Sequence, residues 1–432
     1  MADNYYGMRG VSQWGTDARP KSIREGIRFV DPNGNVPLTG FTAMLKSKAL
    51  DDMEFKWFTR VLASRSGTVT AIYTNAAMTT LYTSGGVAGT VLYVKIPDAS
   101  GGEFIAGRQA LLRDASNLDV DCNVKVTEVT RSYGGTAFTR LKVTLLEADN
   151  GSVDNDLSDA DVIILLSNIN SVGSDTPTAL HKDAVERDNY MQIFKTAADM
   201  AFETINTKYR YAKDPWAACK RDALIDHGLD IELAFLLSVK SLNIGENGKE
   251  EYTGDGLITV IKTLMAGNCA KFAAEAAAPY LNSYFYESGV EWMDEKLATI
   301  FAYGGSNRMA LCGIGALNLI QRVIRANSAY NISFGEKVFG LSVMRWHTPF
   351  GDVALKVHPI FSRIASQTYR ICIFEPEEMK YVYLQNSDTK FRDLATTRTA
   401  KLGEYYTVCG LDFGSIEGAG ILDLAVKNGT PV

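Results

Sequence analysis

The stretch DPWAACKRDALIDHGLDIELAFLLSV, residues 214–239, carries the clearest helix signal in the chain. Asp214 offers a side-chain acceptor at the N-cap, and Pro215 suits the first helical position, where no backbone N–H is needed. Apolar residues then recur at spacings that predict one buried face: Leu224, Ile231, Phe235 and Val239. At about 1.5 Å per residue a helix from Pro215 to Val239 would be about 37 Å long. Such a helix could form the spine of a domain.

Upstream of this helix, residues 68–166 alternate polar and apolar side chains with a period of two, which predicts strands. Val91, Tyr93 and Lys95 alternate with Leu92, Val94 and Ile96. A second predicted hairpin places Val124 and Val126 opposite Leu141, Val143 and Leu145, around the turn Ser132-Tyr133-Gly134-Gly135. We expect a β-rich region with a modest core. The first 55 or so residues contain many glycines and prolines without periodicity, and predict an extended arm.

Downstream, the sequence predicts a compact mixture of helices and strands. Ser288-Gly-Val-Glu291 matches a capping box, and the helix it opens should end at Gly304-Gly305. Residues 309–312 predict a strand, 316–326 a helix, and 339–347 and 352–358 two strands joined by Thr348-Pro349-Phe350-Gly351. Alternation returns in the last part of the chain, at Ile371 and Ile373, Tyr381 and Tyr383, and Tyr406 and Val408. The fold class predicted is α+β.

Composition narrows the function. The chain has 432 residues, 46% hydrophobic and 22% charged, and at about 150 residues per domain this length predicts more than one domain. Forty-four Lys and Arg against 50 Asp and Glu give a net charge of −6, whereas a dedicated nucleic-acid binder is usually basic. Six widely spaced cysteines favour reduced thiols in a cytosol. Neither a signal peptide nor an apolar run of membrane-spanning length is recognisable, so no membrane partner is expected.

Catalytic and ligand motifs are weak. Gly313-Ile-Gly315-Ala-Leu-Asn318 imitates a dinucleotide fingerprint but lacks its third glycine, so a plain strand-to-helix turn is the favoured interpretation. The four histidines do not have zinc-ligand spacing, and the acidic stretch from Asp149 to Asp161 lacks the spacing and glycine of a calcium loop. We expect no catalytic residue, cofactor or metal.

Short motifs in a fixed order resemble a known family. They are Pro37-Leu-Thr39-Gly-Phe41, Glu54-Phe-Lys-Trp57, Asp188-Asn189-Tyr-Met-Gln192-Ile-Phe194, Thr348-Pro349-Phe350-Gly351-Asp352, Phe374-Glu-Pro376 and Thr399-Ala-Lys-Leu-Gly403-Glu404. Together with the predicted spine helix they resemble the tailed-phage major head proteins related to those of large elongated-head podoviruses, over residues 37–425. The chain departs from the pattern at Ala400-Lys401-Leu402, where a tighter Thr-Gly-Asp turn is more usual.

The resemblance implies a Hong Kong 97-like capsid fold. It places an N-terminal arm at 1–56, an extended-loop region with an inserted small β domain at 57–206, a peripheral domain at 207–250 with 370–432, and an axial domain at 251–369. The implied function is structural, without catalysis: many copies form pentamers and hexamers of an icosahedral or elongated head that encloses double-stranded DNA. Alternatives left open are an encapsulin-like compartment subunit and a soluble nucleotide-binding α/β enzyme.

The same resemblance implies the partners and the location. The chain should bind itself, a portal protein at one vertex, a separate scaffolding protein and packaged DNA without sequence specificity, with a decoration protein left open. It should be assembled in the bacterial host cytoplasm and end in the virion capsid.

Four aromatic residues near the N-terminus are candidate assembly contacts, because aromatic side chains contribute disproportionately to buried interfaces. They are Trp14, Phe29, Phe41 and Trp57. For Trp57, ordinary core packing is the alternative. We also expect obligate assembly, because the sequence predicts that the arm and the β-rich region lack cores of their own.

Overall fold

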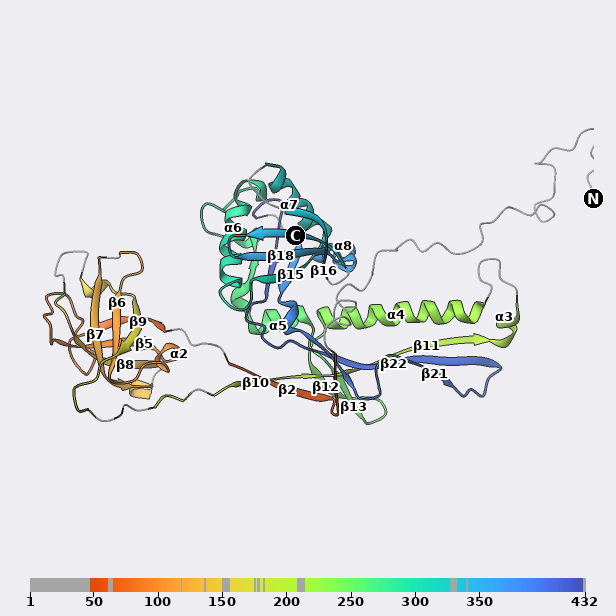
Figure 1. Cartoon of the computed structure of the whole chain (residues 1–432), viewed down its shortest axis with the longest axis horizontal. Coiled ribbons are helices and arrows are strands. Elements are labelled where there is room, and N and C mark those ends of the chain that lie inside the picture. The colour runs from red at the N-terminus through yellow and green to blue at the C-terminus, as the bar shows by residue number, and fades with distance from the viewer. Residues whose placement is uncertain are drawn as a thin grey trace, which may run out of the picture. The chain divides into compact units, whose positions relative to one another are not determined.

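The computed structural model describes residues 47–429 except 61–64, 118, 136, 150–155, 175, 177–178, 182, 208–213, 327–331 and 339–340. It divides into two compact units. One is the inserted unit, residues 60–185. The main unit is formed by the described residues on both sides of that insertion. Figure 1 shows both.

The inserted unit is a seven-stranded antiparallel sheet with strand order β3-β9-β6-β7-β8-β5-β4. Its strands are β3 (Ser66–Thr68), β4 (Ala71–Tyr73), β5 (Val91–Pro97), β6 (Arg108–Arg113), β7 (Asp121–Thr130), β8 (Phe138–Leu145) and β9 (Val162–Asn168). Short helices α2 (Asp98–Gly101), η2 (Tyr133–Gly135) and η3 (Leu157–Asp159) complete it. The hairpin predicted around Ser132–Gly135 is confirmed, with Val124 opposite Leu145 and Val126 opposite Val143.

Two expectations for this region are wrong: that its core is modest, and that it lacks a core of its own. Inward side chains of the period-two strands are completely buried: Leu92, Val94, Ile96, Val124, Val126, Leu141 and Val143 are 0% exposed. They form one cluster made only of residues from this unit. At about 1.5–3 kcal/mol for each fully buried aliphatic side chain, such a cluster offsets a large part of the chain entropy of the insertion.

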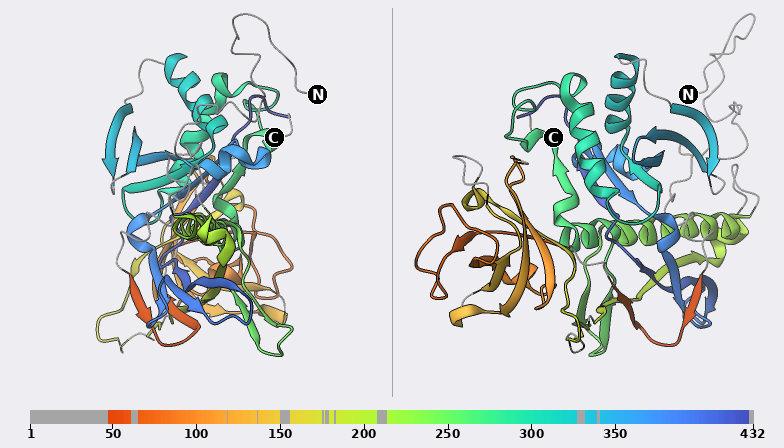
Figure 2. Two further views of the ribbon diagram at one scale, coloured as in Figure 1. Left: turned by 90° about the vertical axis from the view of Figure 1, so that its right-hand side faces the viewer. Right: turned by 60° about the vertical axis from the view of Figure 1, so that its left-hand side comes forward.

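The first layer of the main unit is a five-stranded sheet in the order β1-β20-β22-β11, with β21 beside β22. Its strands are β1 (Lys48–Leu50), β11 (Gln192–Ala201), β20 (Lys380–Leu384), β21 (Lys390–Leu394) and β22 (Ala400–Asp412). Helix α3 (Phe202–Asn206) follows β11, and the long helix α4 (Pro215–Leu237) packs along β11 and β22. In Figure 1 and in the end-on view of Figure 2, α4 lies along one face of this sheet.

Helix α4 confirms the predicted start and corrects the predicted face. The Asp214 side chain accepts a hydrogen bond from the Ala217 N–H at 3.1 Å, as an N-cap should. Ile231 and Phe235 are buried at 4% exposure, but Leu224 and Val239 are 43% and 62% exposed, and the helix ends at Leu237. Residues 400–402, where the sequence departs from the pattern of the family it resembles, are the beginning of β22.

The second layer is a seven-stranded sheet in the order β14-β23-β19-β15-β18-β17-β16. Its strands are β14 (Cys269–Lys271), β15 (Asn307–Cys312), β16 (Ile332–Val338), β17 (Leu341–Thr348), β18 (Gly351–Val357), β19 (Arg370–Phe374) and β23 (Gly420–Asp423). The helices of this layer are α5 (Leu257–Leu264), α6 (Phe285–Ile300), α7 (Ile314–Ala326) and α8 (Pro359–Arg363). Short η4 (Ala266–Asn268), η5 (Phe272–Ala274), η6 (Ala365–Gln367) and η7 (Pro376–Glu378) connect them.

Two sequence expectations change here. Helix α6 begins at Phe285, one turn before the capping box expected at Ser288, because the Glu287 side chain accepts from the Tyr284 N–H at 3.1 Å while Ser288 is buried against the Ser283 hydroxyl. Strands β19 and β23 fall inside the range 370–432 yet pair in the second layer, not with β20 and β22. The strands predicted at 339–347 and 352–358 correspond to β17 and β18, which form an antiparallel hairpin.

Two more strand pairs complete the main unit. Strand β2 (Glu54–Thr59) pairs with β10 (Val185–Tyr190), and β12 (Ser241–Ile244) forms a hairpin with β13 (Glu250–Thr253). The chain leaves the main unit after β2 and returns in β10. With helices and strands segregated along much of the chain, the predicted α+β class is confirmed.

Candidate assembly site

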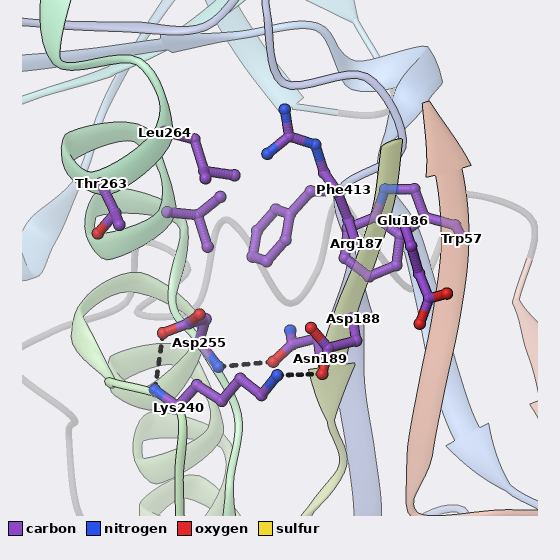
Figure 3. A pocket seen from close by; sticks show the side chains of 11 residues that line it. Trp57, Glu186, Arg187, Asp188, Asn189, Lys240, Asp255, Thr263, Leu264 and Phe413 are labelled. Atoms are coloured by element: carbon purple, nitrogen blue, oxygen red, sulfur yellow. Dashed lines mark hydrogen bonds and ion pairs between the residues drawn. The ribbon is translucent and has the colours of Figure 1, made fainter. Parts of the chain in front are cut away.

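The strand pair β2–β10 borders a cleft of about 220 Å³ in the main unit, shown in Figure 3. Its walls come from β2, β10, the segment after α4, helix α5 and Phe413 after β22. The cleft matters because the inserted unit is attached through these two strands.

One side of the cleft is a continuous polar network. The Lys240 ammonium binds the Asp188 carboxylate, and the Lys240 backbone N–H donates to Asp255 Oδ1 at 2.7 Å. The Asp255 N–H donates to Asn189 Oδ1 at 2.8 Å, and Asn189 Nδ2 donates to the Leu411 carbonyl at 2.9 Å. Asn189 is only 1% exposed, so both ends of its amide are satisfied where water is excluded. The network therefore fixes β10 to β22 and to the segment between β13 and α5.

Arg187 makes a second link at the outer end of the strand pair. Its Nε donates to Thr59 Oγ1 at 3.2 Å and its Nη2 donates to Glu417 Oε1 at 3.2 Å. The Arg187 and Glu417 side chains are 16% and 9% exposed, so removal of either would leave a largely buried charge without its partner. This pair joins the last residues of β2 and the first of β10 to the C-terminal segment.

Trp57 lies in β2 and is half-buried within the subunit. Its indole Nε1 donates to the Gly414 carbonyl at 2.9 Å, and its ring stacks on Phe55 with centroids 5.9 Å apart. These contacts match the core-packing alternative, and an interface role for Trp57 stays a prediction. The other three candidate contacts, Trp14, Phe29 and Phe41, lie outside the described residues.

Phe58 is the aromatic residue that the sequence reasoning missed. It is 68% exposed, whereas Phe55 and Thr59 on the same strand are 8% and 9% exposed. Glu54 and Lys56 are exposed as well and mark the outward face of β2 by the period-two rule. That rule places Phe58 on the charged face, so the signal was present in the sequence. A phenyl ring on a charged strand face is a candidate contact with another chain.

The glycine turn after β15 is filled by the chain itself. A Cβ on Gly313 would lie 2.2 Å from the Thr368 carbonyl oxygen, and one on Gly315 would lie 2.9 Å from Thr368 Cγ2. The Gly313 N–H donates to the Arg370 carbonyl and the Ala316 N–H to the Thr368 carbonyl, both at 3.1 Å. The glycines are explained by close packing against residues 367–370, and the Gly313 and Ala316 N–H groups already have backbone partners.

Two buried histidines tie α4 to other elements. His358 accepts from the Ile360 N–H at its Nδ1, so its Nε2 carries the proton and donates to Glu232 Oε1 on α4 at 2.8 Å. His227 on α4 lies between Thr196 Oγ1 at 2.9 Å and Thr407 Oγ1 at 2.8 Å. Burial lowers the pKa of His227 below its usual value. Both residues have structural contacts on every ring nitrogen.

The cysteines are free thiols, and four of the six are buried. Burial raises the pKa of the Cys312, Cys372 and Cys409 thiols to about 12, which suppresses the reactive thiolate. Within the described residues no cluster of three or more His, Cys, Asp or Glu side chains has metal-binding geometry. Among the described helices, none is both long and apolar enough to cross a bilayer.

Known proteins with related sequences are capsid subunits. A family model described as SU10 major capsid protein matches residues 8–425. The major capsid protein of Pseudomonas phage PaMx41 is 20% identical over 370 residues, which cover 83% of this chain and 77% of the relative.

Two solved structures are also similar to this chain. The capsid of an empty GTA particle covers 96% of this chain and 97% of its own at 11% identity and a TM-score of 0.44. The holo-SrpI encapsulin complex from Synechococcus elongatus PCC 7942 covers 56% and 77% at 14% identity and a TM-score of 0.39. The family model, which spans nearly the whole chain, carries the assignment.

Proposed function

Because the chain belongs to the SU10 major capsid protein family and is therefore a subunit of a phage capsid shell, we propose that it assembles into pentamers and hexamers that enclose double-stranded DNA. The single observation that carries this proposal is the family match over residues 8–425. The fold agrees with it, since the long helix α4, the sheet beneath it and the insertion between β2 and β10 are the parts expected of the Hong Kong 97-like class.

The physical support for self-association comes from exposed apolar side chains on the main unit. Phe58, Val239 and Ile244 are 68%, 62% and 78% exposed, and Phe58 shares its strand with the charged Glu54 and Lys56. Large apolar side chains that stay in water in one subunit are typical of surfaces that another chain covers. Obligate assembly thus rests on these surfaces, not on the absence of a core in the insertion.

The test is assembly of the purified full-length chain, followed by sedimentation and electron microscopy. We expect rapidly sedimenting closed particles, in which most of the protein is found. The proposal that the chain forms a shell would be contradicted by a compact monomer that persists at high concentration. That monomer would also have to stay monomeric when it is co-expressed with the other phage head proteins. Nucleic acid in particles from infected cells distinguishes a phage head from an encapsulin-like compartment, which would contain a cargo protein instead.

Contact with the packaged DNA should be weak and independent of sequence. The net charge of −6 gives little general attraction for phosphates, and no base-reading module is recognisable in the sequence. Binding of dissociated subunits to unrelated duplexes should fall steeply as salt rises. Tight binding that separates one sequence from another at physiological salt would contradict this part of the proposal.

The remaining partners and boundaries are proposals of the same kind. We expect a portal protein at one vertex and a separate scaffolding protein, with assembly in the bacterial host cytoplasm before the subunit reaches the virion capsid. The role is structural, without catalysis. The domain division we propose is an arm at 1–56, an extended-loop region at 57–206, a peripheral domain at 207–250 with 370–432, and an axial domain at 251–369. Within 370–432, strands β19 and β23 pair in the sheet of the axial domain.

A further inference from the structure

Helix α4 exposes a second apolar row in addition to the side that packs on the sheet. Ile225, Leu233 and Leu237 are 38%, 37% and 36% exposed, and Leu229 between them is half-buried. These four residues follow each other at intervals of four, so they form one continuous ridge on the helix surface. The outer face of α4 is defined here as this ridge together with the aspartates beside it.

The aspartates form a parallel row. Asp222, Asp226 and Asp230 are exposed, and each precedes a residue of the apolar ridge by three positions, which makes them surface neighbours. Like charges at intervals of four repel each other by about 0.2–0.5 kcal/mol per pair. The outer face of α4 is thus apolar and acidic at once, and it fits a partner segment that is apolar and basic.

The N-terminal arm contains such a segment. Residues 19–30 read RPKSIREGIRFV, with four basic side chains and one acid, Glu25. The basic residues are Arg19, Lys21, Arg24 and Arg28, and the apolar ones are Ile23, Ile27, Phe29 and Val30. Phe29 is one of the aromatic residues expected from sequence to act as an assembly contact.

The segment can reach the outer face of α4 in its own subunit. The described chain begins at Ser47, next to β1, which pairs in parallel with β20 in the sheet that α4 covers. Residues 31–46 lie between the segment and that point, and at about 3.3 Å per residue they can span about 50 Å. Helix α4 itself is about 35 Å long at about 1.5 Å per residue. No neighbouring subunit is needed for the contact.

We propose that residues 19–30 dock on the outer face of α4 in the same subunit. Ile27 and Phe29 cover the apolar ridge, and Arg24 and Arg28 pair with the aspartate row. The docking itself does not require a shell; only its use in assembly rests on the proposed function. By holding the middle of the arm, it would leave residues 1–18 of each subunit at a defined position for neighbours.

The experiment is hydrogen exchange by mass spectrometry on the full-length chain as dissociated subunits. In the wild type, the backbone amides of residues 19–30 and of residues near 225–237 should exchange at least tenfold more slowly than the same amides in the Asp226→Arg variant. Arg28→Asp should cause the same loss, and the double variant Asp226→Arg with Arg28→Asp should restore most of the protection. Protection should also fall in high salt.

A matched control and a concentration series make the result decisive. Glu246→Arg, an exposed charge reversal in the β12–β13 turn, should leave protection unchanged. Protection that is absent in the wild type, unchanged by Asp226→Arg, or dependent on subunit concentration would overturn docking in the same subunit. Electron microscopy keeps the two proposals apart: normal wild-type shells without arm protection refute only the docking, and protection without shells refutes only the shell.

Discussion

Two phenylalanines three positions apart in β2 provide a direct test of where folding ends and assembly begins. Phe55 is 8% exposed and packs with Met191, Val382 and Val408, whereas Phe58 is 68% exposed on the charged face of the strand. Phe55→Ala and Phe58→Ala delete the same atoms from the same strand. The first should damage the subunit and the second should damage the shell.

The magnitudes follow from burial. Truncation of a buried phenylalanine costs about 3–5 kcal/mol of unfolding free energy. An aromatic side chain buries about 150–250 Å². Since 68% of Phe58 is still exposed, a neighbour could cover on the order of 130 Å² of it, worth about 3 kcal/mol at about 25 cal/mol per Å². A loss of that size weakens each subunit contact roughly 100-fold.

The assays are urea unfolding of dissociated subunits and the subunit concentration needed for particles to form. Phe55→Ala should lower the urea midpoint sharply. Phe58→Ala should leave the midpoint within error and raise the threshold concentration for particles. Lys56→Ala, on the same outward face, is the matched control and should change both little. Normal assembly of Phe58→Ala at the wild-type threshold would refute Phe58 as a contact, and a Phe58→Ala subunit that unfolds would refute its placement on the outward face.

Three further predictions concern α4 and the arm. Leu224→Pro should cost about 3 kcal/mol or more in subunit stability, since proline removes a helical hydrogen bond and clashes with the preceding turn. Leu224→Ala is the control and should form normal shells. Soluble, normal shells from Leu224→Pro as well would refute the assignment of this segment to a helix. Burial lowers the pKa of His227 below its unfolded value of about 6.5, so the unfolded chain takes up the proton first and stability falls as pH drops below that value. Urea unfolding should show this loss in the wild type and a flatter profile in His227→Gln; equal profiles would contradict it. Deletion of residues 1–36 should leave subunits folded, by circular dichroism, but particles absent or aberrant in micrographs, and normal particles would remove the arm from assembly.

Local signals in the sequence predicted local structure well. Asp214 and Pro215 placed the start of α4 correctly, because a cap and its helix are adjacent in the chain. The alternation of residues 91–96 predicted a strand and divided its side chains into two faces, of which the face with Leu92, Val94 and Ile96 is the buried one. Outward Phe58 could have been found by the same rule applied to residues 54–59.

The buried face of α4 could not be found in this way. Apolar residues occur around much of the helix, so its periodicity does not select one face. Ile231 and Phe235 pack on residues from β20, β22 and α5, which are distant in sequence, while Leu224 near the middle of the helix has no such cover. The choice of face is made by tertiary contacts that no local pattern contains.

The inserted unit shows why assembly cannot be inferred from a weak local signal. Five of its seven strands contribute two or three inward apolar residues each, which looks insufficient when the strands are taken singly. Together, these strands turn their apolar residues to one side and build a complete core. Alternation reveals the inward positions of one strand but not how many strands share that side. A need for neighbours is therefore indicated better by apolar residues on faces marked as outward, such as Phe58 in β2 and the ridge of α4, because the subunit's own core has already left these side chains uncovered.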